Sequence, residues 1–218
     1  MTPLVALGLH RFFRRGEVEV PALLDVSLTC EPGELVAVTG PSGSGKSTLL
    51  SLLCGLDHPD GGSVHVAGQR LSHLDPTSAA RLRARHIGVL TQANGLLRHL
   101  TVLDNVRLAE DLRRGTGPTA VELLDGLGLS DVARSLPRTL SGGETARAGL
   151  AVALAGAPTV LLADEPTAEV SAAEEHSVLQ LIARWRPLDG ATVLITHSPE
   201  VARVADRRIA LLDGRVAS

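Results

Sequence analysis

Aromatic side chains are scarce in this chain of 218 residues, which has two phenylalanines, one tryptophan and no tyrosine. A hydrophobic core must therefore be built from leucine, valine, alanine and isoleucine. Apolar residues still make up 44% of the chain, which indicates a globular protein with enough length for one large domain. The same scarcity makes the adjacent pair Phe12 and Phe13 conspicuous.

Cysteine is also rare, because the chain contains only Cys30 and Cys54. Two cysteines exclude a disulfide framework of the kind that supports small secreted domains. Both lie in apolar segments, so we predict that they are small core residues. Free thiols of this kind suit a reducing cytoplasm.

No apolar run is long enough to cross a bilayer, which takes about 20 residues in a helix. The longest run extends from Gly149 to Ala163 and is interrupted by Gly156 and Pro158. The N-terminus lacks a basic region and a small-residue cleavage pattern, so we expect no signal peptide. We therefore predict a cytoplasmic protein, whose association with any membrane comes through another protein.

A strong charge of either sign is absent too, since the net charge is −3 and the isoelectric point is about 6.2. This balance argues against a dedicated nucleic-acid surface, and we expect no nucleic-acid partner. Two local basic clusters, at residues 10–15 and 81–86, are interpreted as solvated faces.

Short apolar runs with the character of strands recur along the chain. They are Leu4–Leu9, Leu23–Cys30, Leu35–Thr39, Ser63–Ala67, Ile87–Thr91, Thr159–Ala163, Ala191–Thr196 and Arg207–Leu212. The first three are predicted to form a small antiparallel element, with a turn at 31–34. The alternation of later runs with helical stretches predicts a parallel sheet covered by helices.

The middle of the chain has no convincing strand and is predicted to be helical. We expect helices over 101–112, over 118–127 with Pro118 in its first turn, and from a Ser141 cap to about Ala155. We interpret 1–218 as one domain. Residues 1–92 and 158–218 would form an α/β core, and residues 93–157 an inserted helical subdomain.

The segment G-P-S-G-S-G-K-S-T at 40–48 lies between a predicted strand and a predicted helix. Glycines in such a loop let backbone N–H groups point inward at a phosphate, and the helix adds the positive end of its dipole. The pattern is that of a P-loop, as opposed to a glycine-rich turn that binds nothing. Its residues are Gly40, Pro41, Ser42, Gly43, Ser44, Gly45, Lys46, Ser47 and Thr48. Lys46 would contact the outer phosphates, and the Ser47 hydroxyl would bind magnesium.

Polar side chains follow three other predicted strands. Asp164 and Glu165 come after V-L-L-A, His197 after V-L-I-T, and Gln92 after I-G-V-L-T. Alone, each is more often a turn residue. Beside a P-loop at the same sheet edge, Asp164 could hold magnesium and Glu165 could orient or deprotonate a water molecule.

The segment Leu140-Ser141-Gly142-Gly143-Glu144 opens a predicted helix and forms a second anion-binding N-terminus. A single bound nucleotide does not require two phosphate-binding segments in one chain. A dimer would use both segments if the second segment of each chain completes the nucleotide site of the other chain.

In order and spacing, these segments resemble the ATP-binding cassette (ABC) family across essentially the whole chain. The resemblance implies an α/β P-loop NTPase fold with a mainly parallel core sheet, an N-terminal antiparallel β element and an inserted helical subdomain. The stretches G-L-D-H-P-D-G-G-S-V and A-R-L-R-A-R-H-I-G-V-L-T-Q-A-N-G-L-L-R-H-L-T-V-L-D-N-V are similar to the subgroup that works with lipoprotein-releasing, macrolide-exporting and cell-division permeases.

The resemblance implies an ATPase that uses ATP and Mg²⁺, closes with a second cassette subunit around two nucleotides, and drives a separate membrane permease. It would lie at the inner face of the cell membrane. The implied catalytic residues are Glu165, His197, Lys46 and Gln92, the implied metal contacts are Ser47, Gln92 and Asp164, and the implied nucleotide contacts are residues 40–48 together with Ser141, Gly142, Gly143 and Phe13. Phe13 would stack on adenine, with Phe12 as the alternative.

Three departures from the family pattern are visible. Ser171 stands where an interface loop usually carries an acid, Val152 replaces a usual arginine, and Thr91 and Ala93 flank Gln92 in place of aromatics. Ser171 is the main support for an alternative function, a slow regulatory switch.

A cassette acting on DNA or ribosomes is disfavoured because tandem cassettes and long insertions are missing. Neither the cargo nor the choice between homodimer and heterodimer follows from these residues.

Overall fold

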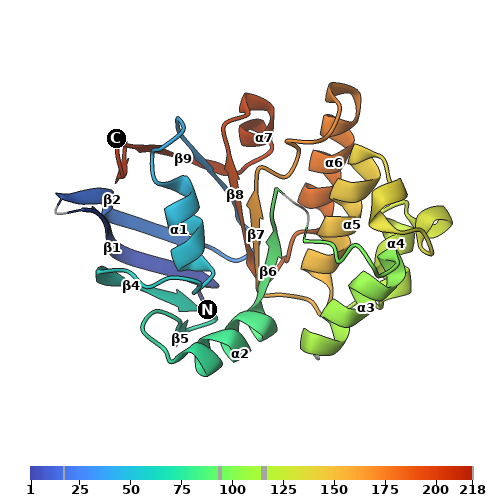
Figure 1. Cartoon of the computed structure of the whole chain (residues 1–218), viewed down its shortest axis with the longest axis horizontal. Helices are drawn as coiled ribbons and strands as arrows, with labels where there is room; N and C mark the ends of the chain where they lie inside the picture. The colour runs from blue at the N-terminus through green and yellow to red at the C-terminus, as the bar shows by residue number, and fades with distance from the viewer. Residues whose placement is uncertain (17, 93–94, 114–116, 218) are drawn as a thin grey trace.

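The structure is a computed structural model that describes residues 1–16, 18–92, 95–113 and 117–217. In Figure 1 an antiparallel sheet lies at the left, a second sheet crosses the centre, and a group of helices covers the right-hand side. Helix α1 (Lys46–Leu53) lies between the two sheets. The prediction of an α/β protein with a mainly parallel core sheet is confirmed.

The central sheet has the strand order β10-β9-β3-β8-β7-β6. Its members are β3 (Leu35–Thr39), β6 (Ile87–Leu90), β7 (Val160–Asp164), β8 (Ala191–Thr196), β9 (Arg207–Leu212) and β10 (Arg215–Val216). All neighbours are parallel except β9 and β10. In the ladder, Thr39 pairs with Thr196 and Asp164 with Ile195, so the carboxyl ends of β3, β8 and β7 meet at one edge.

The antiparallel sheet has the order β2-β1-β4-β5 and contains β1 (Leu4–Arg15), β2 (Val18–Cys30), β4 (Gly61–Val66) and β5 (Gln69–Arg70). The predicted grouping of 35–39 with the first two strands is wrong, because β3 pairs in parallel with β8 and β9. The reason is burial. The first four residues of β3 are all buried, which suits a strand covered on both faces, whereas the second half of β2 alternates between buried and exposed residues.

The remaining helices are α2 (Pro76–His86), α3 (Val102–Arg113), α4 (Ala120–Gly126), α5 (Gly142–Leu154), α6 (Ala172–Trp185) and α7 (Pro199–Arg203), with 3₁₀ turns at Ser130–Val132 and Pro137–Thr139. Ser141 caps α5 as predicted. Pro118 is not in the first turn of α4, because Thr119 is the N-cap and forms a reciprocal capping box with Glu122. The strand expected to reach Thr91 ends at Leu90.

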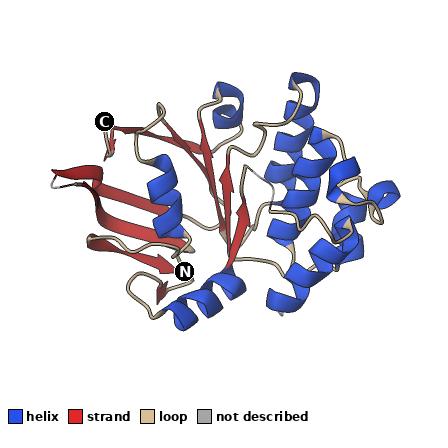
Figure 2. Ribbon diagram, in the orientation of Figure 1, coloured by secondary structure: helices blue, strands red, loops and turns tan. Residues whose placement is uncertain are grey.

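Two hydrophobic clusters lie on the two faces of the central sheet, and Figure 2 shows helices on both sides of it. Strand β7 contributes alternately, with Val160 and Leu162 in the cluster beneath α1 and Leu161 and Ala163 in the cluster beneath the larger helical group. The division into a core and a subdomain at 93–157 stays a prediction.

The two cysteines are buried, unpaired members of the cluster that contains α1. Burial raises the pKa of both thiols to about 12, so they remain protonated at neutral pH. The prediction that they are small core residues is confirmed.

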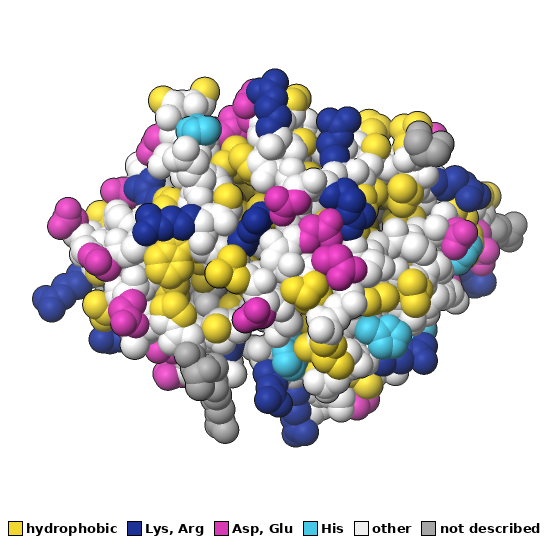
Figure 3. Space-filling model, turned by 180° about the vertical axis from the view of Figure 1, so that it is seen from behind, with side chains coloured by type: hydrophobic (Ala, Val, Ile, Leu, Met, Phe, Trp, Pro, Cys, Tyr) yellow, Lys and Arg dark blue, Asp and Glu magenta, His cyan; other side chains and the backbone are white. Residues whose placement is uncertain are grey.

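Within the described ranges, every helix is too short or too polar to cross a membrane. On the face in Figure 3, acidic and basic side chains are interspersed.

Candidate nucleotide-binding site

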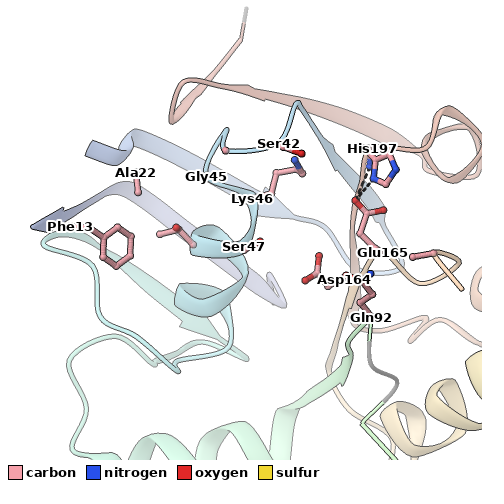
Figure 4. Close-up of a pocket in the computed structure, with 13 residues that line it drawn as sticks. Phe13, Ala22, Ser42, Gly45, Lys46, Ser47, Gln92, Asp164, Glu165 and His197 are labelled. Atoms are coloured by element: carbon pink, nitrogen blue, oxygen red, sulfur yellow. Dashed lines mark hydrogen bonds and ion pairs between the residues drawn. The ribbon is translucent and has the colours of Figure 1, made fainter. Parts of the chain in front are cut away.

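A pocket of about 550 Å³ opens at the carboxyl-terminal edge of the central sheet, where doubly wound folds bind their ligands. Segments that are far apart in the chain contribute to it, as Figure 4 shows. Its lining residues are Phe13, Ala22, Ser42, Gly43, Gly45, Lys46, Ser47, Thr48, Gln92, Asp164, Glu165, Ala168 and His197. Most of the predicted site residues are thus brought together in one place.

The P-loop joins β3 to α1, and its backbone requires glycine. Gly43 has a φ of +81° and Gly45 a φ of +102°, a region that other residues rarely adopt. A Cβ on Gly45 would also lie 2.4 Å from the carbonyl oxygen of Ala22. Three predicted contacts, Gly40, Pro41 and Ser44, do not line the pocket.

Lys46 is the first residue of α1, so its charge and the helix N-terminus point into the same space. Its Nζ atom donates to the carbonyl oxygens of Gly40 and Pro41, at 2.8 Å each. The ammonium group and the helix N-terminus together form a donor set that fits phosphate oxygens.

Asp164 ends β7 and points into the pocket from the sheet (Figure 4). Burial raises the pKa of its carboxyl group, the neighbouring Glu165 raises it further, and Lys46 opposes both effects. A cation bound beside this carboxyl group would favour its ionised form. Together with the Ser47 hydroxyl and the Gln92 amide, Asp164 offers the hard oxygen ligands that magnesium prefers.

Glu165 follows Asp164 and turns away from the strand with a φ of +46°, a left-handed conformation that is unusual for a residue with a side chain. Its carboxylate accepts hydrogen bonds from the Thr196 hydroxyl and the His197 backbone N–H, both at 3.1 Å. Its Oε1 atom lies 2.6 Å from Nδ1 of His197. Three contacts to the last residue of β8 and the residue after it therefore hold this carboxylate in the pocket lining.

Gln92 lines the pocket from the segment that follows β6. Ala93, which follows Gln92 and departs from the family pattern, lies outside the described residues. Val152 lies on α5 and is not among the residues that line the pocket, and its carbonyl oxygen accepts a hydrogen bond from Nη1 of Arg113 at 3.1 Å.

Ser141, Gly142 and Gly143 do not line the pocket of their own chain. They form the N-terminus of α5, where Ser141 and Glu144 make a capping box with distances of 2.8 and 3.2 Å. Both glycines are closely packed. A Cβ on Gly142 would lie 2.3 Å from the Glu169 carbonyl oxygen, and one on Gly143 would lie 2.4 Å from Oε1 of Glu174.

Phe13 lines the pocket, and 43% of its surface is exposed. Phe12 is not among the lining residues, and its ring stacks on His10. Two residues near Phe13 were not expected at the site: Ala22, which lines the pocket, and Arg11.

Arg11 is not the solvated side chain that was expected for the basic cluster at 10–15, because it is partly buried and paired. Its guanidinium carbon lies 4.9 Å from the Phe13 ring centroid, and its nitrogens bind Asp57 at 2.8 Å and Asp60 at 3.2 Å. A cation over an aromatic face at this distance is attractive and would hold the ring in place. The sequence carried no local signal for this, because the two acids are distant along the chain.

The fold and the pocket are those of a P-loop nucleotide-binding domain. Residues 23–168 match the family described as ABC transporter. The chain belongs to the ABC transporter family, and the prediction of an ABC-type ATPase domain is confirmed.

Curated relatives support this membership. The chain is 42% identical over 217 residues to the macrolide export ATP-binding/permease protein MacB of Rhodopirellula baltica, a match that covers 96% of this chain and 32% of the relative. It is 40% identical over 221 residues to MacB of Salmonella typhimurium, covering 99% and 34%. The chain thus spans about a third of the length of these relatives.

Solved structures show the same fold. A dimeric structure of a post-hydrolysis state of the ATP-binding cassette MJ0796, bound to ADP and Pi, has a TM-score of 0.88 and 33% identity, and the match covers 99% of this chain and 97% of that one. A nucleotide-free ATP-binding cassette from an ABC transporter is similar in fold, with a TM-score of 0.81 at 22% identity, and covers 100% and 90%.

Proposed function

We propose that the pocket binds ATP with Mg²⁺ and hydrolyses the terminal phosphate. One observation carries the proposal: the P-loop residues Lys46 and Ser47 share a pocket with Asp164, Glu165 and His197. A phosphate cradle, a metal-binding carboxylate and a second carboxylate for water are the parts that P-loop phosphoryl transfer needs. A regulatory switch with slow turnover is not favoured, because Glu165 and His197 are both in place.

In this proposal Lys46 neutralises charge on the outer phosphates, and Ser47, Asp164 and Gln92 hold the metal. Magnesium, when bound, would supply positive charge that offsets the negative charge developing on the phosphate in the transition state. Glu165 orients a water molecule and accepts its proton, while His197 and Thr196 hold the carboxylate. His197 would also contact the terminal phosphate.

We infer that two cassettes close around two nucleotides. The supporting observation is that Ser141 and Gly143 lie outside their own pocket, at a helix N-terminus suited to phosphate. The structural relative MJ0796 has been solved as a dimer. The second cassette is either a copy of this chain or a different subunit.

The partner that uses the energy is proposed to be a transmembrane permease. The relatives are named as combined ATP-binding/permease proteins, and this chain matches about a third of their length. The cassette would then act at the inner face of the membrane, in export or in mechanotransmission. Recovery of an integral membrane protein with the tagged chain, identified by mass spectrometry, would identify that partner.

Phosphate release from ATP by the purified chain, with and without Mg²⁺, tests the activity. We expect hydrolysis that depends on the metal, and nucleotide binding that saturates. Failure to bind ATP at millimolar concentration would overturn the proposal.

Phe13→Ala is expected to raise the KM for ATP more than it lowers kcat. Stacking on adenine is remote from the reacting phosphate, so its loss is mainly a uniform loss of binding. Stacking of an aromatic side chain on a base is worth roughly 1–3 kcal/mol, which corresponds to about 5- to 150-fold in KM. Phe12→Ala is the matched control. An effect in Phe12→Ala without one in Phe13→Ala would show that Phe12, and not Phe13, stacks on adenine.

Ser171→Asp is expected to raise ATP hydrolysis, or to stabilise the ATP-bound dimer in a Glu165→Gln background. A charge-assisted hydrogen bond across the interface would be about twice as strong as one from serine. In a single chain the Ser171 hydroxyl donates to Oε2 of Glu174 at 2.9 Å, so a new carboxylate would face an existing one.

For this reason the variant is compared with Ser171→Asp in combination with Glu174→Gln, which removes the local repulsion. Turnover is measured in the wild type, the single variant and the double variant, and the dimer fraction is measured in the same three proteins with Glu165→Gln added. If neither quantity rises in the single or the double variant, the serine is a neutral replacement.

A further inference from the structure

We propose that Glu175, in the first turn of α6, is a positioning residue that holds together the two loops carrying Glu165 and His197. The inference rests on the proposed ATPase function and extends it to a residue outside the pocket. Glu175 is not among the lining residues, so it would act through the groups that it binds.

The carboxylate of Glu175 joins two loops that are separated along the chain. Its Oε1 atom accepts hydrogen bonds from the Thr167 hydroxyl at 3.0 Å and from the Ser198 hydroxyl at 3.3 Å. Thr167 is two residues after Glu165, and Ser198 directly follows His197. Thr167 is only 7% exposed, so its hydroxyl depends on a protein partner.

The hydrogen bonds continue from Ser198 to the catalytic candidate. The Ser198 backbone N–H donates to the Thr196 hydroxyl at 2.9 Å, and that hydroxyl donates to Oε2 of Glu165 at 3.1 Å. Glu175 therefore anchors both ends of a short network, at Thr167 beyond Glu165 and at Ser198 beside His197. Because Glu165 has a left-handed backbone, its side-chain direction depends on such anchors.

The placement of α6 gives this network a link to the proposed dimer interface. Helix α6 begins directly after Ser171, and the preceding loop packs on the α5 N-terminus, where the Glu169 carbonyl lies against Gly142. A shift of the first turn of α6 would move Glu175 and, with it, the loops of Glu165 and His197. The Ser171 side chain bonds to Glu174 in this first turn but caps none of the helix's backbone N–H groups, whereas Glu175 connects the first turn to the site.

The test compares Glu175→Ala, Glu175→Gln and the control Glu200→Gln. Glu200 is an exposed carboxylate on nearby α7 that pairs with Arg203 and lies outside the network. Misplacement of a catalytic group by about 1 Å can cost roughly 100-fold in rate. We expect Glu175→Ala to lower kcat about tenfold, with a KM for ATP within about twofold of wild type. Glu175→Gln should retain most activity, because its amide oxygen still accepts both hydroxyl hydrogens.

Two further measurements separate positioning from a general loss of structure. In a Glu165→Gln background, Glu175→Ala should cause no further loss of rate, since it acts through Glu165. Hydrogen exchange should be faster at 165–170 and 196–200 in Glu175→Ala and unchanged in Glu200→Gln.

An unchanged kcat in Glu175→Ala, or an additive loss in the Glu165→Gln background, would overturn the inference. An equal loss in Glu175→Gln and Glu175→Ala would do so as well. If the wild-type chain binds no ATP, the proposed function fails, and the exchange measurement alone then decides whether Glu175 holds the two loops.

Discussion

Lys46→Ala is expected to abolish ATP hydrolysis and to weaken ATP binding by about three orders of magnitude. Lys46 is the only lysine or arginine among the described residues that line the pocket, so no neighbour replaces its charge. Two unit charges 4 Å apart attract by about 4 kcal/mol near a protein surface, which corresponds to roughly 1000-fold in affinity. The measurements are phosphate release and titration with a fluorescent ATP analogue.

Arg14→Ala is the matched control, because it removes a cation from an exposed ion pair with Glu19 on the antiparallel sheet. Lys46 is also the only lysine in the sequence. An amine-reactive reagent therefore has two targets, Lys46 and the N-terminus, and ATP should slow modification of Lys46 alone. Normal hydrolysis by Lys46→Ala would refute the assignment of the P-loop as the phosphate site.

Glu165→Gln is expected to slow hydrolysis by about 10²–10⁴-fold, the usual cost of losing a general base, while ATP binding is retained. The amide keeps the shape of the side chain and can still accept a hydrogen bond from Thr196, but it cannot take a proton from water. Trapped ATP should then hold two chains together. Size-exclusion chromatography with ATP and Mg²⁺ should show a dimer, which ADP should not support.

Glu200→Gln removes a carboxylate from α7 and should leave both turnover and dimerisation unchanged. Equal rates for wild type and Glu165→Gln would mean that another group accepts the proton. A variant that loses turnover without gaining a dimer would support Glu165 as the base and contradict closure of two identical chains, which would indicate a different cassette as the partner.

Much of this fold was predictable because its signals are local. Strands β3 and β8 have the predicted bounds, since continuous apolar runs identify strands that are covered on both faces. Strand β9 also has the predicted bounds, although it begins with two exposed arginines. Ser141 was predictable as a helix cap because serine followed three residues later by glutamate makes its own reciprocal contacts. The P-loop depends in the same way on glycine positions within one short segment.

Contacts between distant segments were not predictable. The sequence could not assign β3 to its sheet, because its partners β8 and β9 lie more than half the chain away. It also could not separate Phe12 from Phe13. The pairing of β1 with β2 shifts register between Arg11 and Phe12, and such a shift changes which side chains face each side of a strand. The adenine-stacking role of Phe13 stays a prediction, although it is Phe13 that lines the pocket.

The sequence by itself determined the class of chemistry: a phosphate loop, two acids after a strand, a histidine after another strand and a second glycine-rich helix start. Each is a short pattern whose geometry follows from its own residues. Only the tertiary structure decided how they are held. His197 on Glu165, Ser198 on Glu175, and the two acids Asp57 and Asp60 that hold Arg11 beside Phe13 all join side chains far apart in the chain. Such hydrogen bonds and ring contacts act over a few ångströms, so they exist only once folding has brought their partners together.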